Sequence, residues 1–125
     1  MPRPPKTVIV VANDLANGLS GLFSILEDQG FRLRRAGTTE ELPALLRDSP
    51  ESVVVAYETP GEDTAHQVLL ALAEAEHKTP VVVVARSGDF DEYYELMCEG
   101  AYDYFDLRDG ADVIGRSVRW AAKAA

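Results

Sequence analysis

Runs of β-branched residues divide the chain into alternating strands and helices. Residues 7–12, 52–56 and 81–85 are almost continuous in Val or Ile, with no polar residue at alternate positions. Such runs predict strands buried on both faces, as in a parallel sheet covered by helices. The shorter stretches 31–35 and 102–107 predict an edge strand and a last strand.

Apolar residues between these runs recur at helical spacing. The first stripe, which runs from Leu15 to Leu26, predicts a helix capped by Asn13 or Asp14 and ended by Gly30. Thr38 and Glu41 have the spacing of a capping box ahead of a short second helix. The apolar positions of the other three helices are Ala65, Val68, Leu69 and Leu72; Phe90, Tyr93, Tyr94 and Met97; and Val113, Ile114, Val118 and Ala121.

The alternation of five strands with five helices predicts one α/β domain. We expect it to span residues 1–125, with residues 1–6 as an extended or disordered lead-in. The strands should form one parallel sheet with helices on both faces. In such sheets the functional crevice lies beyond the carboxyl ends of the strands.

Composition narrows the possible partners and the compartment. The 125 residues are 46% hydrophobic, enough for one core, and the formal net charge of −9 disfavours binding to nucleic acid or to an anionic membrane surface. Cys98 is the single cysteine, so no internal disulfide forms, and a reducing cytoplasm is expected. The first apolar run is too short for a signal or membrane segment, so none is expected.

Four stretches of the chain resemble the receiver domain of bacterial response regulators, in the order in which that family carries them. Residues 8–14, 50–61, 80–86 and 100–108 read VIVVAND, PESVVVAYETPG, PVVVVAR and GAYDYFDLR. Members of the family typically have a strand that ends in two acids, then PDLVLLDxxMPG, PVIxLTA and GAxDYxxKP. The resemblance runs from about Lys6 to Ala121 and implies a flavodoxin-like (βα)5 fold with strand order 2-1-3-4-5.

The resemblance also implies which positions would carry phosphoryl transfer, and most of them lack the required group. Receivers use a carboxylate nucleophile after the third strand, acids that hold magnesium after the first, a hydroxyl after the fourth and a lysine after the fifth. The nucleophile, hydroxyl and lysine positions fall on Ala56, Ala85 and Leu107. We therefore expect a degenerate receiver, or pseudo-receiver, that is not an enzyme and needs no cofactor.

The acid pair after the first strand allows two registers. If Ala12 and Asn13 occupy the pair, both acids are lost; if Asn13 and Asp14 occupy it, one acid remains. We favour the second register because it places the first helix on the family's apolar positions and Gly30 on its helix-ending glycine. Asp14 is then either a helix N-cap or a remnant of a metal site.

Glu58 lies two positions after Ala56 and has three possible roles. It could be a solvated loop acid, or a second weak magnesium ligand together with Asp14. Alternatively, it points into the vacated pocket and mimics a permanent negative charge. Two carboxylates without a third ligand or a phosphate make a weak magnesium site, so no occupied metal site is expected.

The fourth helix, the last strand and the final helix form the family's usual partner surface. Tyr104 matches the family's switch aromatic and is expected either inward over Ala85 or exposed on the surface. Trp120 is either a core residue or an exposed anchor for a partner. Opposite charges would permit a homodimer, whereas the alternative is a solvated charged face. These charged residues are Asp91, Glu92, Glu95, Asp103, Asp106, Arg108, Arg116, Arg119 and Lys123.

The remaining chemistry-bearing residues favour ordinary structural roles. The phosphate-binding and nucleophile motifs common in α/β enzymes do not occur in the sequence. His66 and His77 are expected on the surface rather than as metal ligands, and Cys98 as a packed thiol.

These observations predict a signal-transduction or transcription-regulating module that acts by protein–protein contact without phosphorylation. Its partner would be another protein, an effector domain or a second copy. The alternative is a sensor that binds a small molecule in the crevice near Ala56, Ala85 and Asp14. Phosphoryl acceptance at another acid is a third hypothesis.

Overall fold

The computed structural model describes residues 6–12, 19–59 and 62–124 and contains a five-stranded parallel sheet. The strand order is β2-β1-β3-β4-β5, as the sequence predicts. The strands are β1 (Thr7–Val11), β2 (Arg32–Ala36), β3 (Ser52–Glu58), β4 (Val81–Ala85) and β5 (Asp103–Asp106). The helices are α1 (Ser20–Asp28), α2 (Leu42–Asp48), α3 (Thr64–Glu74), α4 (Phe90–Cys98) and α5 (Ala111–Ala124), with short 3₁₀ turns η1 (Thr39–Glu41) and η2 (Leu107–Asp109).

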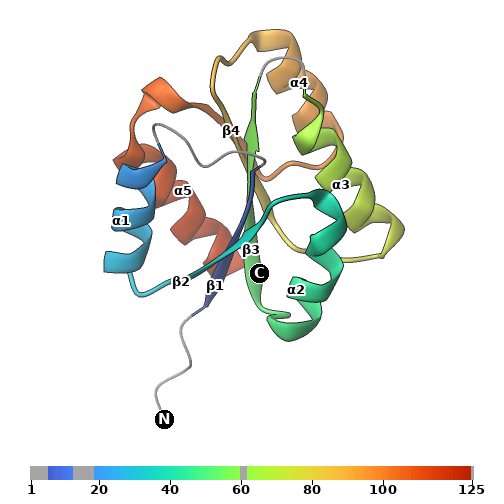
Figure 1. The fold of residues 1–125 in the computed structure, drawn as a ribbon. Helices are drawn as coiled ribbons and strands as arrows, with labels where there is room; N and C mark the ends of the chain where they lie inside the picture. Colours follow the sequence, from blue (N-terminus) through green and yellow to red (C-terminus); the bar gives the residue numbers. More distant parts are fainter. Residues whose placement is uncertain (1–5, 13–18, 60–61, 125) are drawn as a thin grey trace.

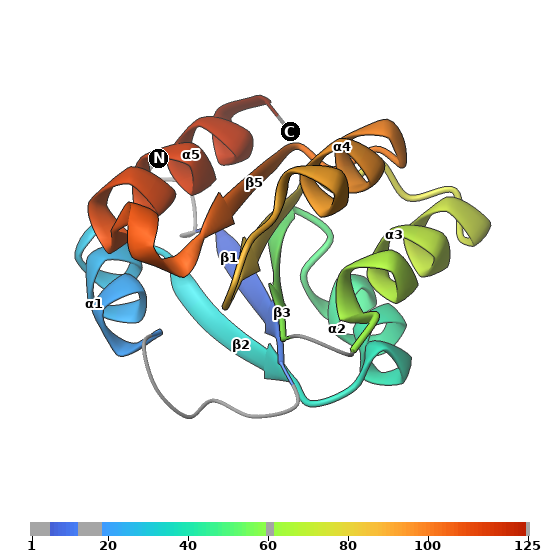
Figure 2. The same cartoon turned by 90° about the horizontal axis from the view of Figure 1, so that it is seen from above.

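The helices cover the sheet in two layers. Figures 1 and 2 show α1 and α5 on one face, and α2, α3 and α4 on the other. The three central strands are buried at every position, which explains their continuous Val and Ile runs. β2 and β5 form the two edges and are only partly buried. The flavodoxin-like (βα)5 prediction is confirmed.

Alternate residues of each central strand contribute to two separate cores. On the α1 and α5 face, Val10, Val55 and Val84 pack with Leu22 and Ile114. The other face has its own cluster, which includes Ile9, Val54, Ala56, Val83, Val68 and Leu96. Each fully buried aliphatic side chain contributes about 1.5–3 kcal/mol, so both layers are needed to stabilise the sheet.

Two helix boundaries follow the signals in the sequence. The Glu41 carboxylate accepts a hydrogen bond from the backbone N–H of Thr38 at 2.9 Å, which completes the predicted capping box before α2. Gly30 adopts a φ of +90° just after α1, a conformation that favours glycine and ends the helix.

Other expectations are wrong. α1 begins at Ser20, with Leu19 in the N-cap position, so the helix starts later than the apolar stripe from Leu15 predicts. Residues 13–18 lie outside the described residues, as do residues 1–5 of the predicted lead-in. Lys6 is described, and its carbonyl accepts a hydrogen bond from the backbone N–H of Arg32 at the start of the sheet.

The apolar stripes of α4 and α5 do not all face inward. Leu96 is the buried residue of α4, whereas Phe90, Tyr93 and Tyr94 are exposed. Val113 is also exposed, although Ile114, Val118 and Ala121 are buried as predicted. Cys98 is an exposed free thiol, not a packed one. Across the described residues, no helix has the length and apolar character that a membrane span requires.

Candidate functional site

The positions that the sequence assigns to the crevice are filled by small or apolar side chains. Ala56 is fully buried in β3, in register with Val11 of β1 and Val83 of β4. Ala85 is the last residue of β4, aligned with Glu58 on one side and Asp106 on the other. No hydroxyl or carboxylate projects from either alanine, so neither offers a group that could accept or contact a phosphoryl group.

The structure does not bring Leu107 to the same face as Ala56. Leu107 begins η2 and packs against the core beneath α1 and α5, whereas Ala56 belongs to the core beneath α2, α3 and α4. Asn13 and Asp14 lie outside the described residues. Within the described part of the chain, no three His, Cys, Asp or Glu side chains are arranged to hold a metal ion.

Glu58 is the last residue of β3, and the expectation of a solvated loop acid is wrong. Only 4% of the residue is exposed, and its carboxylate Oε2 accepts a hydrogen bond from the backbone N–H of Ala65 at 2.8 Å. Glu58 shares a strand face with Ala56 because side chains alternate along a strand.

Burial raises the pKa of the Glu58 carboxyl to about 7. The hydrogen bond from Ala65 and the charge of His66 oppose this increase in the pKa, whereas the carboxylates of Glu92 and Asp63 add to it. The buried carboxyl is therefore close to half-protonated near neutral pH, which does not suit a mimic of permanent negative charge.

A hollow of about 510 Å³ opens beside Glu58, between the first turns of α3 and α4. Its lining is mostly acidic, and neither Ala56 nor Ala85 belongs to it. The lining residues are Glu58, Asp63, His66, Asp89, Phe90, Asp91, Glu92 and Glu95. These carboxylates would repel a negatively charged ligand, so the hollow disfavours anions.

His66 connects α3 to α4 and is half-buried rather than a free surface residue. Its Nδ1 lies 2.7 Å from Oε1 of Glu99, and its Nε2 lies 3.9 Å from Oε2 of Glu95. Burial, the largest single influence, lowers the pKa of His66. The hydrogen bond to Glu99 and the negative charges of Glu99, Asp63 and Glu58 together outweigh it, so the pKa lies above its usual value. The imidazolium form therefore stabilises this contact between the two helices.

Tyr104 is held by hydrogen bonds over the connection between β4 and α4, so the exposed alternative is wrong. Its hydroxyl donates to Oε1 of Glu92 at 2.6 Å and accepts from the backbone N–H of Asp89 at 3.3 Å. The ring of Tyr93 meets the Tyr104 ring edge-on, with centroids 5.8 Å apart. Burial, together with the hydrogen bond to Glu92, raises the pKa of the phenol well above its usual range.

Asp106 joins two loops through one carboxylate. Oδ2 accepts hydrogen bonds from the backbone N–H of Gly88 at 2.9 Å and from Nη2 of Arg108 at 2.8 Å. Oδ1 accepts a hydrogen bond from the backbone N–H of Arg108 at 2.7 Å. The guanidinium of Arg108 and these backbone donors lower the pKa of Asp106 well below its usual range. The Asp-x-Arg spacing is visible in the sequence, but the contact with Gly88 depends on the fold.

Of the other residues expected at the partner surface, some form contacts within the chain and the rest are exposed. Asp103 accepts a hydrogen bond from the hydroxyl of Ser117 at 2.8 Å, and Arg108 pairs with Asp106. Trp120 is 57% exposed and so is not a core residue; the ammonium of Lys123 lies 5.0 Å from its ring centroid. The remaining expected surface residues are exposed: Asp91, Glu95, Arg116 and Arg119.

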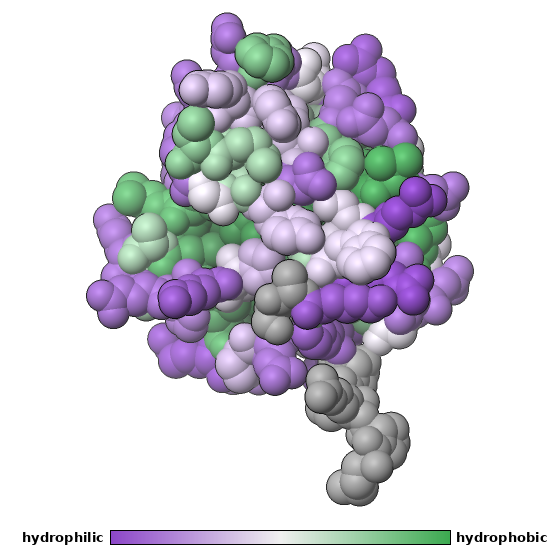
Figure 3. Space-filling view, turned by 180° about the vertical axis from the view of Figure 1, so that it is seen from behind, coloured by the Kyte–Doolittle hydropathy of each residue, from purple (hydrophilic) through white to green (hydrophobic). Residues whose placement is uncertain are grey.

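A groove of about 290 Å³ runs beside Trp120. Tyr102, Phe105 and Val113 contribute apolar surface to it, and Asp103 and Arg116 contribute charge. Figure 3 looks at the β5 edge of the sheet, between α4 and α5, where hydrophilic side chains border paler, less polar ones. The α4–β5–α5 surface thus combines exposed aromatic groups with a charged border.

Comparison with known proteins places the fold among response-regulator receivers. No protein-family model and no curated protein sequence matches the chain. Among solved structures, FixJ-N matches with a TM-score of 0.81 and 22% identity over 96% of this chain and 95% of its own. A response-regulator receiver domain protein from Clostridium thermocellum matches with a TM-score of 0.77 and 18% identity, over 95% of each chain.

A response regulator from Thermotoga maritima matches with a TM-score of 0.76 and 22% identity over 95% of this chain and 98% of its own. At these identities the likeness establishes the fold alone. The chain therefore has the flavodoxin-like fold of receiver domains.

Proposed function

We propose that this chain is a degenerate receiver that acts in the cytoplasm as a signalling module, by protein–protein contact and without aspartyl phosphorylation. The observation that carries the proposal is the buried methyl group of Ala56 on β3. The resemblance to receivers assigns the phosphoacceptor to this position, and alanine has no nucleophilic atom. Ala85 and Leu107 likewise lack the hydroxyl and the ammonium that would respond to a phosphoryl group.

The buried carboxylate of Glu58, two residues along the same strand, is a poor substitute for the missing aspartate. Glu58 is buried, one of its oxygens is held by the N–H of Ala65, and its pKa is raised to about 7. A carboxyl that is partly neutral and shielded from solvent is a weak nucleophile and a weak magnesium ligand. Its environment supports a structural role in the connection between β3 and α3.

The α4–β5–α5 surface supports a binding role. Exposed aromatic side chains with a charged border are typical of protein interfaces, and Trp is enriched at their energetic centres. Trp120, Tyr102 and Val113 supply the apolar part, while Arg116 and Arg119 supply the charge. The partner would be an effector domain, another signalling protein or a second copy of this chain.

The phosphorylation-independent part is tested by incubation with acetyl phosphate and magnesium, followed by intact-mass measurement and analytical ultracentrifugation. We expect no phosphoryl adduct and no change in assembly, because Ala56 cannot accept the group. A matched Ala56→Asp variant tests whether an acceptor alone restores the reaction. A stoichiometric adduct on the natural chain would mean that another acid is the acceptor and that the proposal is wrong.

The surface is tested by Trp120→Ala, with Leu70→Ala as a matched removal of an exposed apolar side chain on α3, outside the α4–β5–α5 surface. If the partner is a second copy, Trp120→Ala weakens self-association at least about tenfold, as expected for an interface hot spot. Leu70→Ala should leave the association unchanged. Equal effects of the two variants would contradict a specific role for the groove beside Trp120.

A second candidate function is sensing of a small molecule in the crevice. The space that favours this alternative is the acidic hollow beside Glu58, which does not include Ala56 or Ala85, and its lining suits an organic cation. A thermal-shift screen that includes agmatine separates the two candidates. A saturable increase in the melting temperature that Glu92→Gln reduces supports the sensor, whereas no saturable increase supports the interaction module.

A further inference from the structure

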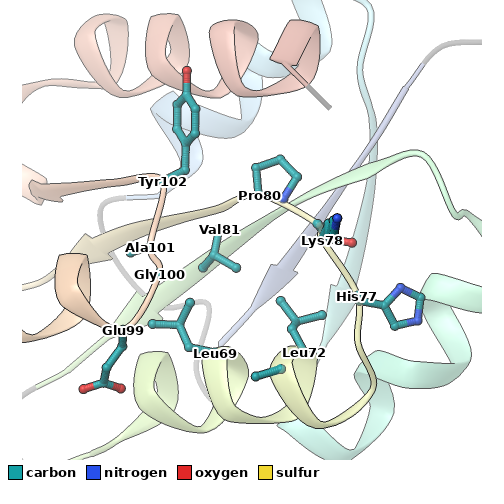
Figure 4. A pocket seen from close by; sticks show the side chains of 12 residues that line it. Leu69, Leu72, His77, Lys78, Pro80, Val81, Glu99, Gly100, Ala101 and Tyr102 are labelled. Atoms are coloured by element: carbon teal, nitrogen blue, oxygen red, sulfur yellow. The ribbon is translucent and has the colours of Figure 1, made fainter.

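A separate hollow opens at the end of the sheet opposite the crevice. It has a volume of about 580 Å³ and lies between the C-terminal half of α3, the start of β4 and the turn from α4 into β5. In Figure 4, the side chains of Leu69 and Leu72 extend from α3 toward Val81 of β4, and Tyr102 points away from them toward α5.

The hollow results from the offset between α3 and α4. His66, in the first turn of α3, contacts Glu99 at the C-terminal cap of α4. α4 therefore ends beside the start of α3 and leaves the C-terminal half of α3 without a helix on that side. Gly100, with a φ of +112°, then turns the chain directly toward β5.

The base of the hollow is apolar. It is formed by Leu69, Leu72, Val81 and Ala101, none of which is more than 8% exposed. The volume is within the range of about 300–1,000 Å³ that small-molecule sites occupy. A ligand with a compact aromatic or branched body would cover this base and remove more of its surface from water.

The charge at the rim indicates which polar group the ligand would carry. Lys78 lies on the loop between α3 and β4 and forms no ion pair with any residue in the described part of the chain. The Glu99 carboxylate is already engaged by His66 and, in Figure 4, points away from the leucines. The rim therefore offers an ammonium group whose charge is not compensated.

The two helix ends beside the hollow do not cancel this charge. The last carbonyls of α3 and α4 accept hydrogen bonds from the turns that follow them: His77 N–H binds Leu72 O at 2.9 Å, and Ala101 N–H binds Leu96 O at 3.0 Å. These carbonyls are thus partly neutralised. Of the two basic residues in the lining, His77 and Lys78, we take the Lys78 ammonium as the group that attracts an anion.

We propose that this hollow binds a small amphipathic carboxylate, with its apolar body against Leu69, Leu72 and Ala101 and its carboxylate beside Lys78. The site is independent of the phosphorylation positions. Tyr102 belongs both to the margin of this hollow and to the groove beside Trp120, so the site adjoins the proposed partner surface.

The proposal is tested with phenylbutyrate, titrated into the full chain while amide proton–nitrogen correlation spectra are recorded. A ligand of this size should bind with a Kd of about 1 mM and give saturable shifts at the amides of Leu72, Gly100 and Ala101. Phenylbutanol, which has the same apolar body without the charge, should bind about fivefold more weakly. Shifts that do not saturate, or that centre on other elements, would overturn the site.

Two pairs of variants separate the site from general effects. Lys78→Glu should weaken phenylbutyrate binding about tenfold, whereas Arg47→Glu, on the exposed side of α2, should leave it unchanged. Ala73→Phe fills the hollow from an exposed helix position and should abolish binding, whereas Ala44→Phe, at an exposed position of α2, should not. Equal binding of the alcohol and the acid, or equal effects within a pair, would overturn the proposal.

Discussion

The carboxylate of Glu58 and the backbone N–H of Ala65 are 2.8 Å apart, so a buried side chain at the end of β3 holds the first turn of α3. Protonation of this carboxyl links the connection between strand and helix to pH. The pKa of about 7 lies above the ordinary value of 4.5, so the folded state retains the proton more strongly than the unfolded state.

The first prediction concerns the pH dependence of stability. Between pH 4.5 and about 7 the folded chain keeps a proton on Glu58 that the unfolded chain has lost. The contribution of Glu58 to the free energy of unfolding therefore falls as pH rises through this window. The total loss is at most about 3 kcal/mol and is complete above the folded pKa. Urea unfolding should show a steeper loss of stability in the wild type than in Glu58→Gln.

The matched control for this experiment is Glu74→Gln, an exposed acid of α3. Its pH profile should follow that of the wild type. The raised pKa of His66 also removes stability as pH rises, which makes the difference between variants the informative quantity. An unchanged pH slope in Glu58→Gln would show that the carboxyl titrates normally.

A second prediction addresses the contact between His66 and Glu99. A double-mutant cycle with His66→Gln and Glu99→Gln should give a coupling of about 0.5–1 kcal/mol under mildly acidic conditions, since both side chains are partly exposed. The coupling should be present below the unfolded pKa of histidine and be lost as pH rises through the raised folded pKa. The same coupling at alkaline pH would show that the charge of His66 is not involved.

A third prediction concerns the Tyr104 hydroxyl. Tyr104→Phe removes the hydrogen bond to Glu92 and the acceptor for the N–H of Asp89, and should cost about 1–2 kcal/mol in the free energy of unfolding. Tyr94→Phe removes a hydroxyl from an exposed tyrosine of α4 and should change stability by less than about 0.5 kcal/mol. Chemical denaturation of both variants distinguishes these values.

A fourth prediction uses two helical glycines. At Gly115 in α5, an added Cβ would lie 2.8 Å from Cγ2 of Ile25, so Gly115→Ala should destabilise the packing of α1 against α5 by about 1–3 kcal/mol. At Gly21 in α1, the nearest atom would be the Cβ of Ala111 at 3.8 Å, so Gly21→Ala should be neutral or stabilising by about 0.5–1 kcal/mol. Opposite signs in thermal unfolding would confirm both estimates.

The sequence predicted the central sheet well because burial on both faces requires apolar residues at every position. In the strands that contain Val10, Val53 and Val82, apolar and polar residues do not alternate. Few structures other than a parallel sheet covered by helices bury such a strand on both faces. The capping box of Thr38 and Glu41 was equally visible because its partners are three residues apart.

The candidate site was harder to predict because its contacts join distant parts of the chain. Glu58 looked like a loop acid because a polar residue after Ala56 resembles the end of a strand, yet β3 continues and α3 covers the carboxyl. On α4, spacing alone cannot distinguish the stripe that contains Phe90 and Tyr94 from the face on which Leu96 is buried. That choice depends on where the neighbouring helix lies.

The carboxylate of Asp106 couples two loops at the carboxyl end of the sheet. Because Gly88 and Arg108 donate hydrogen bonds to the same carboxylate, a displacement of the loop before α4 either breaks one of these bonds or shifts the carboxylate that also holds Arg108. A partner that binds Arg108 and displaces it would therefore also affect the hydrogen bond that holds the loop before α4. Displacement of either loop thus involves both helices that border the β5 edge.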